Sequence, residues 1–376
     1  SNIGRSLTLS TNGTVTQTGA IVSANAGTLT VKTTNDTGSA ITLTNASNEF
    51  TNVDLRARNL ADSANIAAAI SYTDVTGFNV NTIGTLSTVN LTANGALSDS
   101  GAITGTTLTT SSVGGTILDF GHALTGFNAT NTTSGNIQLV NSTNALTVSG
   151  IAQPSTGTVT ITNNGGNLTF SSALNNSYAL VASSSGSVIF SGALGGTTPL
   201  TSVNATGTTD VQLNGGGITT TGTQSYTGAA TLGAATTLTT TNNNITFSST
   251  VNGAQTLTLA AGSGVVSFGG AIGTTTAPTV FNSTGGGNVS FGGTVGNSTH
   301  RLTSVTLAGS ATVNGGAFTS GAQTFNAVTL SGASTFDSSA STVNIGGAVT
   351  GGGFALTMNV TGTTSAIAGV ISNISS

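Results

Sequence analysis

Hydrophobic residues alternate with small polar residues along most of this chain. Short runs of the form apolar, polar, apolar recur between clusters of Gly, Asn, Ser and Thr, as in 159–161, 168–170, 245–247 and 257–259. A period of two residues is typical of a strand with one buried face. The residue types between the runs tolerate tight turns and positive φ. The pattern therefore predicts an all-β chain of short strands.

The strands themselves recur at a fixed spacing. Residues 135–151 align with residues 157–173 at a shift of 22, which places Ile137 with Val159 and Leu146 with Leu168. A similar interval separates Phe170 from Phe190 and separates successive members of the series Phe247, Phe268 and Phe291. A short-strand repeat of this length is typical of a solenoid. We expect one continuous parallel β-helix over residues 1–376, with about 17 or 18 coils of 20–23 residues.

A longer repeat lies on top of the coil repeat. The block 190–260 aligns with the block 291–360 at offsets between 98 and 102; "FSGALGGTTPLTSV" (190–203), for example, aligns with "FGGTVGNSTHRLTSV" (291–305). This offset is four to five coils, so we interpret it as a duplicated block. Residues 121–376 read as regular coils, and residues 1–120 as a less regular part of the same solenoid.

Stacked coils place equivalent residues above one another at about 4.8 Å. Aliphatic and aromatic side chains then form an inner ladder, while Thr, Ser and Asn form outer ladders. The core ladder is predicted to include Phe170, Phe190, Phe247, Phe268, Phe291, Leu257 and Leu259. Only 14 residues are charged, nine acidic and five basic. Like charges stacked on successive coils would repel each other, which accounts for their scarcity.

Ten of the fourteen charged residues lie between residues 32 and 119. In "NVDLRARNL" (52–60), Asp54, Arg56 and Arg58 alternate with apolar residues, so the three charges share one outward face. One interpretation is a solvated strand that discourages lateral association. The other is a polar docking strip for another chain or a glycan.

The remaining sequence offers little for catalysis. Beyond residue 120 only Asp210, Arg301 and Asp337 are charged, whereas a polysaccharide lyase or glycosidase on this scaffold needs clustered carboxylates. "DFGH" (119–122) contains a kinase-like DFG triplet followed by His122, but the chain lacks the Gly-rich phosphate loop and Lys that accompany this triplet in kinases. The chain has no cysteine, and its net charge of -4 gives no strong attraction to nucleic acid. We therefore predict no catalytic residue, no metal and no cofactor, no nucleic-acid partner and no membrane insertion.

Several segments resemble a known class of repeat proteins. "NEF" (48–50), "LTANGALSDSGAITGTTLTTSSVGGT" (91–116), "ITTTGTQSYTGAATLGAATTLTT" (218–240) and the opening stretch are similar to the β-strand repeats of filamentous-haemagglutinin-like and autotransporter-like secreted bacterial adhesins. The resemblance covers essentially the whole chain. It implies a right-handed parallel β-solenoid that is exported to the cell surface and used in adhesion, a matrix or a surface layer.

These observations together predict a non-enzymatic extracellular protein, a rod-like stalk or matrix segment of a large secreted bacterial adhesin. We expect the chain to be processed or to be a segment of something longer. The C-terminal "TSAIAGVISNISS" (364–376) reads as another coil, so further coils or a second copy would cover its open edge. The main alternative is a subunit that polymerises end to end into a fibre, sheath or surface layer. Ice binding, and binding or cleavage of a polysaccharide, are minor alternatives.

Overall fold

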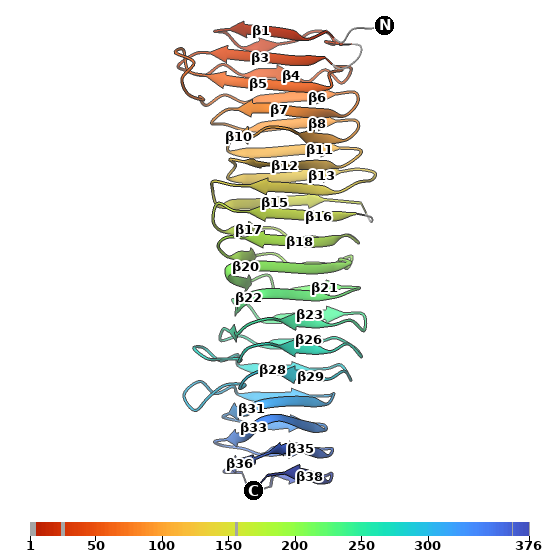
Figure 1. Ribbon diagram of the computed structural model, residues 1–376, viewed down its shortest axis with the longest axis vertical. Coiled ribbons are helices and arrows are strands. Elements are labelled where there is room, and N and C mark those ends of the chain that lie inside the picture. The colour runs from red at the N-terminus through yellow and green to blue at the C-terminus, as the bar shows by residue number, and fades with distance from the viewer. Residues whose placement is uncertain (1–4, 24–26, 155–156, 363, 376) are drawn as a thin grey trace. The chain divides into compact units, whose positions relative to one another are not determined.

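The computed structural model describes residues 5–23, 27–154, 157–362 and 364–375. Every regular element in these residues is a β-strand, and neighbouring strands of each sheet run parallel. The chain divides into two compact units, Ser1–Gly186 and Ser187–Ser376. Within each unit the strands stack as turns of a β-solenoid (Figure 1). The two units together make about 17 turns. The predicted fold class is confirmed.

The strands of the first unit are short and follow one another at close intervals. They are β1 Leu7–Thr11, β2 Val15–Thr16, β3 Thr28–Thr34, β4 Ile41–Leu43, β5 Asn52–Arg58, β6 Ile70–Asp74, β7 Phe78–Gly84, β8 Val89–Ala93, β9 Leu97–Asp99, β10 Ile103–Thr104, β11 Thr107–Ser112, β12 Thr116–His122, β13 Gly126–Asn131, β14 Ile137–Asn141, β15 Leu146–Ala152, β16 Thr158–Asn163, β17 Leu168–Phe170 and β18 Ala179–Ser184.

The second unit contains the remaining strands. They are β19 Val188–Phe190, β20 Ser202–Leu213, β21 Gly217–Thr220, β22 Gln224–Leu232, β23 Thr236–Thr240, β24 Ile245–Phe247, β25 Val251–Asn252, β26 Leu257–Ala260, β27 Val266–Phe268, β28 Val280–Ser283, β29 Val289–Phe291, β30 Ser304–Leu307, β31 Ala311–Thr319, β32 Gln323–Phe325, β33 Val328–Ser338, β34 Val343–Ile345, β35 Val349–Phe354, β36 Leu356–Val360, β37 Ala366–Ile367 and β38 Ile371–Ile374.

In the first unit, the strands other than β10 alternate between two rows, and β10 pairs with the end of β7. One row runs β1, β3, β5, β7, β9, β12, β14, β16, β18, and the other runs β2, β4, β6, β8, β11, β13, β15, β17. Ile137 pairs with Val159, and Leu146 pairs with Leu168. These are the pairs that the shift of 22 predicts, so the register follows the sequence repeat.

In the second unit, each coil has three sides. The first side carries the starts of β20, β22, β31, β33, β35 and β38, with β24, β27 and β29. The second side carries the ends of β22, β31 and β33, with β25, the single residues Ile272 and Val295, and β36. The third side carries β21, β23, β26, β28, β30, β32, β34 and β37.

Coil length varies more than the sequence repeat predicts. Ile41 pairs with Ile70, which makes a coil longer than the predicted range, and Ala311 pairs with Val328, which makes a coil shorter than it. Only the strand segments have to stay in register, because they carry the interstrand hydrogen bonds. Loops between them absorb the extra residues, so the predicted range of coil lengths is too narrow.

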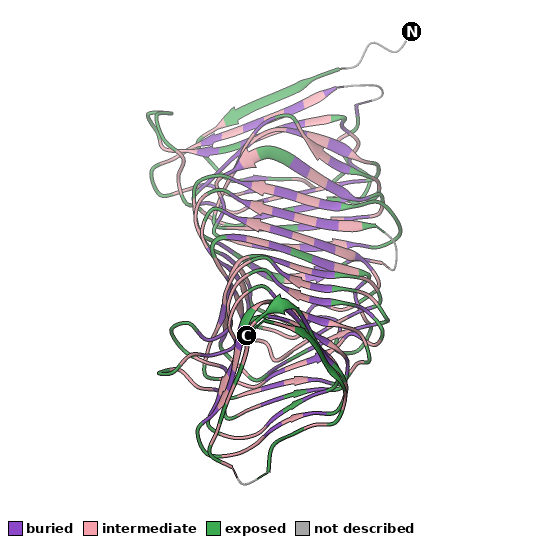
Figure 2. Ribbon diagram, turned by 60° about the horizontal axis from the view of Figure 1, so that its bottom comes forward, coloured by how far each residue is buried: buried purple, intermediate pink, exposed green. Residues whose placement is uncertain are grey.

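Inward side chains form the core of each unit. Figure 2 shows buried and part-exposed residues alternating along the strands. In the second unit, Phe247, Phe268 and Phe291 lie in register and are buried. Ring centroids are 5.1 Å apart for Phe247 and Phe268 and 5.7 Å apart for Phe268 and Phe291, with nearly parallel planes. The predicted core residues Phe170, Phe190, Leu257 and Leu259 are likewise buried. The stacking of these rings adds to the hydrophobic stabilisation that comes from removing each ring from water.

Polar side chains occupy several of the corners. In the first unit, the buried Asn141 donates from Nδ2 to Oδ1 of Asn163, one coil further on, at 3.0 Å. Gly228 in the second unit has φ of +105°, and a Cβ there would lie 2.3 Å from the carbonyl oxygen of Gly207. The close approach of neighbouring coils therefore requires glycine at that corner.

Candidate interaction site

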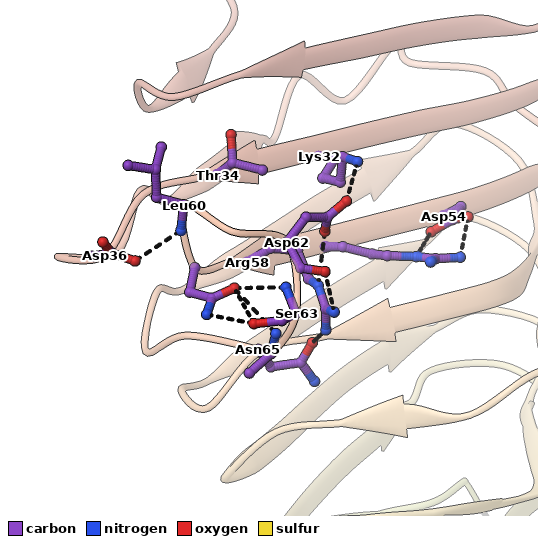
Figure 3. Close-up of polar contacts among 12 residues, drawn as sticks. Lys32, Thr34, Asp36, Asp54, Arg58, Leu60, Asp62, Ser63 and Asn65 are labelled. Atoms are coloured by element: carbon purple, nitrogen blue, oxygen red, sulfur yellow. Dashed lines mark hydrogen bonds and ion pairs between the residues drawn. The ribbon is translucent and has the colours of Figure 1, made fainter.

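Charged residues gather on the outer face of β3 and β5 in the first unit (Figure 3). Val53, Leu55 and Ala57 are buried, so the residues between them face outward. Arg56 is exposed, and Asp54 is partly exposed. Lys32 on β3 is in register with Arg56 on β5. Two cations therefore lie side by side on neighbouring coils, an arrangement that would be repulsive without partners.

Each of the two cations turns to a different carboxylate. Arg56 donates from Nε to Oδ1 of Asp54 at 2.6 Å and from Nη2 to Oδ2 at 2.7 Å. Lys32 Nζ lies 2.6 Å from Oδ2 of Asp62. A bidentate guanidinium–carboxylate pair restricts the orientation of Arg56. The stacked charges are thus neutralised by Asp54 on β5 and by Asp62 in the loop that follows it.

A loop of residues 59–65 folds back beside the strip. Arg58 reaches into it, with Nε 3.1 Å from Oδ1 of Asp62 and with a hydrogen bond from Nη1 to Oδ1 of Asn65 at 2.6 Å. Oδ1 of Asn59 accepts hydrogen bonds from the backbone amides of Ser63 and Ala64. These bonds restrict the loop through its side chains, as in an Asx turn.

Asp62 joins the loop to the strip. Its φ of 52° is a left-handed conformation, which Asp tolerates better than most residues. The hydrogen bond from Lys32, and next that from Arg58, hold the pKa of Asp62 below its ordinary value. Oδ1 of Asp36 accepts the amide of Leu60, and the Leu60 side chain is 62% exposed. The loop therefore exposes the apolar side chain of Leu60, while its polar groups form hydrogen bonds within the protein.

A shallow depression of about 240 Å³ adjoins the strip. It is lined by Thr8, Leu9, Ser10, Thr30, Lys32, Asp54 and Arg56. This volume is below the roughly 300 Å³ at which sites for small organic ligands begin. Its two cations already have carboxylate partners. The chemistry on offer is hydrogen bonding to hydroxyl or amide groups, with little net charge to attract an ion.

The structure brings together only part of the predicted docking strip. Asp54 and Arg56 bind each other, whereas Arg58 belongs to the network of Asp62 and Asn65. Lys32 and Asp62 are absent from the strip predicted from sequence. Lys32 precedes Arg56 by one coil, so the coil spacing could have revealed their proximity. Nothing in the alternation pattern indicates that the loop returns Asp62 to the strip.

His122 and Asp99 form a buried pair in the first unit. Nδ1 of His122 accepts the backbone amide of Ile103 at 2.9 Å, and Nε2 lies 3.2 Å from Oδ2 of Asp99. The Asp99 carboxylate also accepts the amides of Asp119 and Phe120, both at 3.1 Å. Because Nδ1 accepts this hydrogen bond, the neutral ring carries its proton on Nε2. Both ring nitrogens face protein groups, so the pair has a structural role at the corner.

A second polar cluster lies in the second unit. Nη1 of Arg301 is 2.6 Å from Oδ1 of Asp337, and the guanidinium carbon is 6.0 Å from the ring centre of Phe318. The hydrogen bond from Arg301 holds the pKa of Asp337 below its ordinary value. Arg301 reaches past one whole coil, because Leu302 pairs with Thr319 and Phe318 in turn pairs with Asp337. In the sequence Arg301 and Asp337 appear as isolated charges, because the predicted coil spacing does not bring them onto neighbouring coils.

The described ranges hold neither a metal-binding cluster nor a membrane-spanning helix. Among residues 5–23, 27–154, 157–362 and 364–375, no group of three or more His, Asp or Glu side chains could hold a metal ion. In the same part of the chain, no helix is long and apolar enough to cross a membrane.

Comparison with protein families gives a match at the start of the chain. Residues 1–55 match a family described as repeats of unknown function (DUF5649), and this segment ends within β5. No curated protein and no solved structure matches the chain. The match and the stacked coils together identify a repeat protein of β-solenoid fold.

Proposed function

We propose that this chain is a non-enzymatic extracellular structural protein, a stalk or matrix segment of a large secreted bacterial adhesin. The observation that carries the proposal is an outward column of hydroxyl groups in the second unit. It runs in register through Ser225, Thr246, Ser267, Ser290, Thr312, Thr329, Thr350 and Ser372.

A column of this kind suits a passive spacer. Each coil adds one hydroxyl residue outside and apolar residues inside, so length grows without a new surface chemistry. Hydroxyl groups solvate the outer face without the like-charge repulsion that stacked Lys or Glu would create. The resemblance to secreted β-strand repeats supports an extracellular location, and the absence of cysteine suits folding without oxidation.

The first unit supports the same proposal. Paired outward columns run through Ser71, Asn90, Thr109 and Asn128 and through Thr73, Thr92, Ser111 and Thr130. The charges of the strip on β3 and β5 are matched by carboxylates within the strip and its loop. Such a surface makes hydrogen bonds in all directions and favours no one charged partner.

Labelling of intact source cells tests the location. Cysteine is absent from the chain, so a Ser267→Cys variant carries one outward thiol that an impermeant maleimide can reach only outside the cell. We expect labelling on intact cells equal to that after lysis. A Phe268→Cys variant, whose thiol would be buried, controls for unfolded protein. Labelling of Ser267→Cys only after lysis would refute an extracellular role.

A double variant of the strip tests whether this surface binds a target. Because a spacer does not itself bind, we expect chain-coated beads to attach to cells and glycan surfaces no more than uncoated beads, and Arg56→Ala with Arg58→Ala to leave this background unchanged. A matched variant on the hydroxyl column, Thr246→Ala with Ser267→Ala, provides the comparison. A selective loss of attachment in the arginine variant would make the strip a docking site.

A fibre or sheath subunit is the second candidate. The edge strands β1 and β38 expose Leu7, Leu9 and Ile371, and Val370 is 73% exposed. Either further coils of a longer parent chain or a second copy of this chain would cover these residues. Electron microscopy of the purified chain separates the alternatives, since single particles favour the stalk and long fibres favour the subunit.

A further inference from the structure

The duplicated block contains the same side-chain arrangement twice within the second unit. Nε2 of Gln224 donates to the carbonyl oxygens of Ile218 and Thr239 and to Oγ1 of Thr220, at 2.9 to 3.3 Å. Oγ1 of Thr220 donates to the carbonyl oxygen of Gly222 at 2.6 Å. We call this arrangement the first glutamine corner.

The second glutamine corner repeats each of these bonds. Nε2 of Gln323 donates to the carbonyl oxygens of Ala317 and Asp337 and to Oγ1 of Thr319, at 2.8 to 3.2 Å. Oγ1 of Thr319 donates to the carbonyl oxygen of Gly321 at 2.6 Å. Four matching bonds, together with the aligned sequences, make the two corners copies of one local structure.

The two corners lie at different places in the coil. In the first corner the chain passes from the third side, at β21, to the first side, at β22. In the second corner it passes from the second side, at the end of β31, to the third side, at β32. If the two copies were separated by a whole number of coils, the second corner would also lie between the third and first sides. It lies one side earlier. Five whole coils lead from Gln224 down the first side to Val328, whereas its copy, Gln323, lies one side earlier.

The same displacement holds along the whole block. Residues of the first copy on the first, second and third sides have their counterparts on the third, first and second sides. The pairs are Val203 and Val305, Ile245 and Val343, Val251 and Val349, Leu238 and Phe336, and Leu257 and Leu356. Each strand of the second copy thus lies on a different side of the coil from its counterpart in the first copy.

We infer that one side of a coil, and not the whole coil, is the unit in which this chain can be lengthened or shortened. Strands of the first and third sides alternate two inward apolar residues with one outward polar residue, as in β24 and β34, and on the second side the copied strand is likewise buried at Phe336. The same strand sequence can therefore pack on any of the three sides of a coil. A duplicated block turns its outward features onto another side: the loop between Leu194 and Leu200 interrupts the third side, and its copy between Val295 and Leu302 interrupts the second.

This inference rests on the solenoid fold and does not depend on the proposed extracellular role. Deletion of Thr221–Thr319 tests it. This variant, which we call the one-side deletion, removes five coils less one side. It joins Thr220 to Ser320 and places Gln323 in the position of Gln224. Every later strand then moves by one side. A whole-coil deletion, Gln224–Ala327, keeps every later strand on its own side. A third deletion, Thr221–Gly316, ends within a strand and disrupts the alternation of inward and outward residues.

We expect the first two variants to retain the β circular dichroism spectrum and the thermal unfolding profile of the full chain, and the third to lose them. An engineered disulfide reports the displacement itself. Asn204 pairs with Ser225 in the full chain, so Thr324 comes to lie beside Asn204 in the one-side deletion. Asn204→Cys with Thr324→Cys is then expected to crosslink in that variant, because paired strand residues lie within disulfide reach, and to remain reduced in the full chain.

Three outcomes would overturn the inference. One is a one-side deletion that unfolds or fails to crosslink while the whole-coil deletion folds. Another is failure of both, which would mean that the stack cannot be shortened in this way. The third is folding of the Thr221–Gly316 deletion with equal stability, because strand register would then not be the requirement.

Discussion

Replacement of Tyr226 by Phe isolates one buried hydrogen bond of the first glutamine corner. Tyr226 is fully buried, and its hydroxyl donates to Oε1 of Gln224 at 2.9 Å. Burial raises the pKa of the Tyr226 hydroxyl, so it remains a donor at all ordinary pH values. The variant keeps the ring, which stacks on Phe247 with centroids 4.9 Å apart. It removes only the hydroxyl and leaves the Gln224 oxygen without that donor.

The expected cost is about 1 to 3 kcal/mol, the range for a buried polar group that loses its partner. Because solenoids unfold in local segments, a single global free energy is not the right measure. Hydrogen exchange in peptides spanning β21 and β22 measures the local value. A cost of this size accelerates exchange through local opening by about 5- to 140-fold, at tenfold for each 1.4 kcal/mol.

Tyr178 provides the matched control. It is also buried, but its hydroxyl has no hydrogen-bond partner among the described residues. Tyr178→Phe removes the same atom without breaking a hydrogen bond, so we expect no loss of protection around β18. The reasoning would be refuted if Tyr226→Phe accelerated exchange no more than Tyr178→Phe does.

The remaining predictions concern four other positions. Phe325→Tyr is expected to slow exchange around β32, because the new hydroxyl can donate to Oε1 of Gln323, which has no partner in the described structure. Phe268→Asp is expected to lower local stability by several kcal/mol by burying an unpaired charge, and unchanged thermal unfolding would contradict its inward packing. The lowered pKa of Asp62 means that its ion pairs stabilise the 59–65 loop above the unfolded pKa of about 3.9 and are lost as pH falls through the folded value; loop exchange should rise in acid, and Asp62→Asn should abolish that dependence. Nitrogen NMR of the neutral His122 ring is expected to show the proton on Nε2, and the opposite tautomer would contradict the Ile103 hydrogen bond.

The coil stack could be predicted from sequence because its rules are local. Alternation selects the inward residues, and a nearly constant spacing places Ile137 beside Val159 and Phe247 beside Phe268. In a parallel stack the neighbour of a residue lies one coil away, so the chain spacing translates directly into a contact.

The same rule explains what sequence reasoning missed. Where loops change the coil length, chain spacing no longer indicates which residues meet. Asp62 reaches Lys32 only because residues 59–65 fold back, and Arg301 reaches Asp337 only because its side chain extends past the coil between them.

The sequence by itself determined the strand type, the parallel stack and the duplicated block, because these depend on period and copying. Only the tertiary structure decided which side each copy occupies and which charges pair. The physical reason is that side and pairing depend on the summed length of every loop between two strands, and alternation along the chain carries no record of that sum.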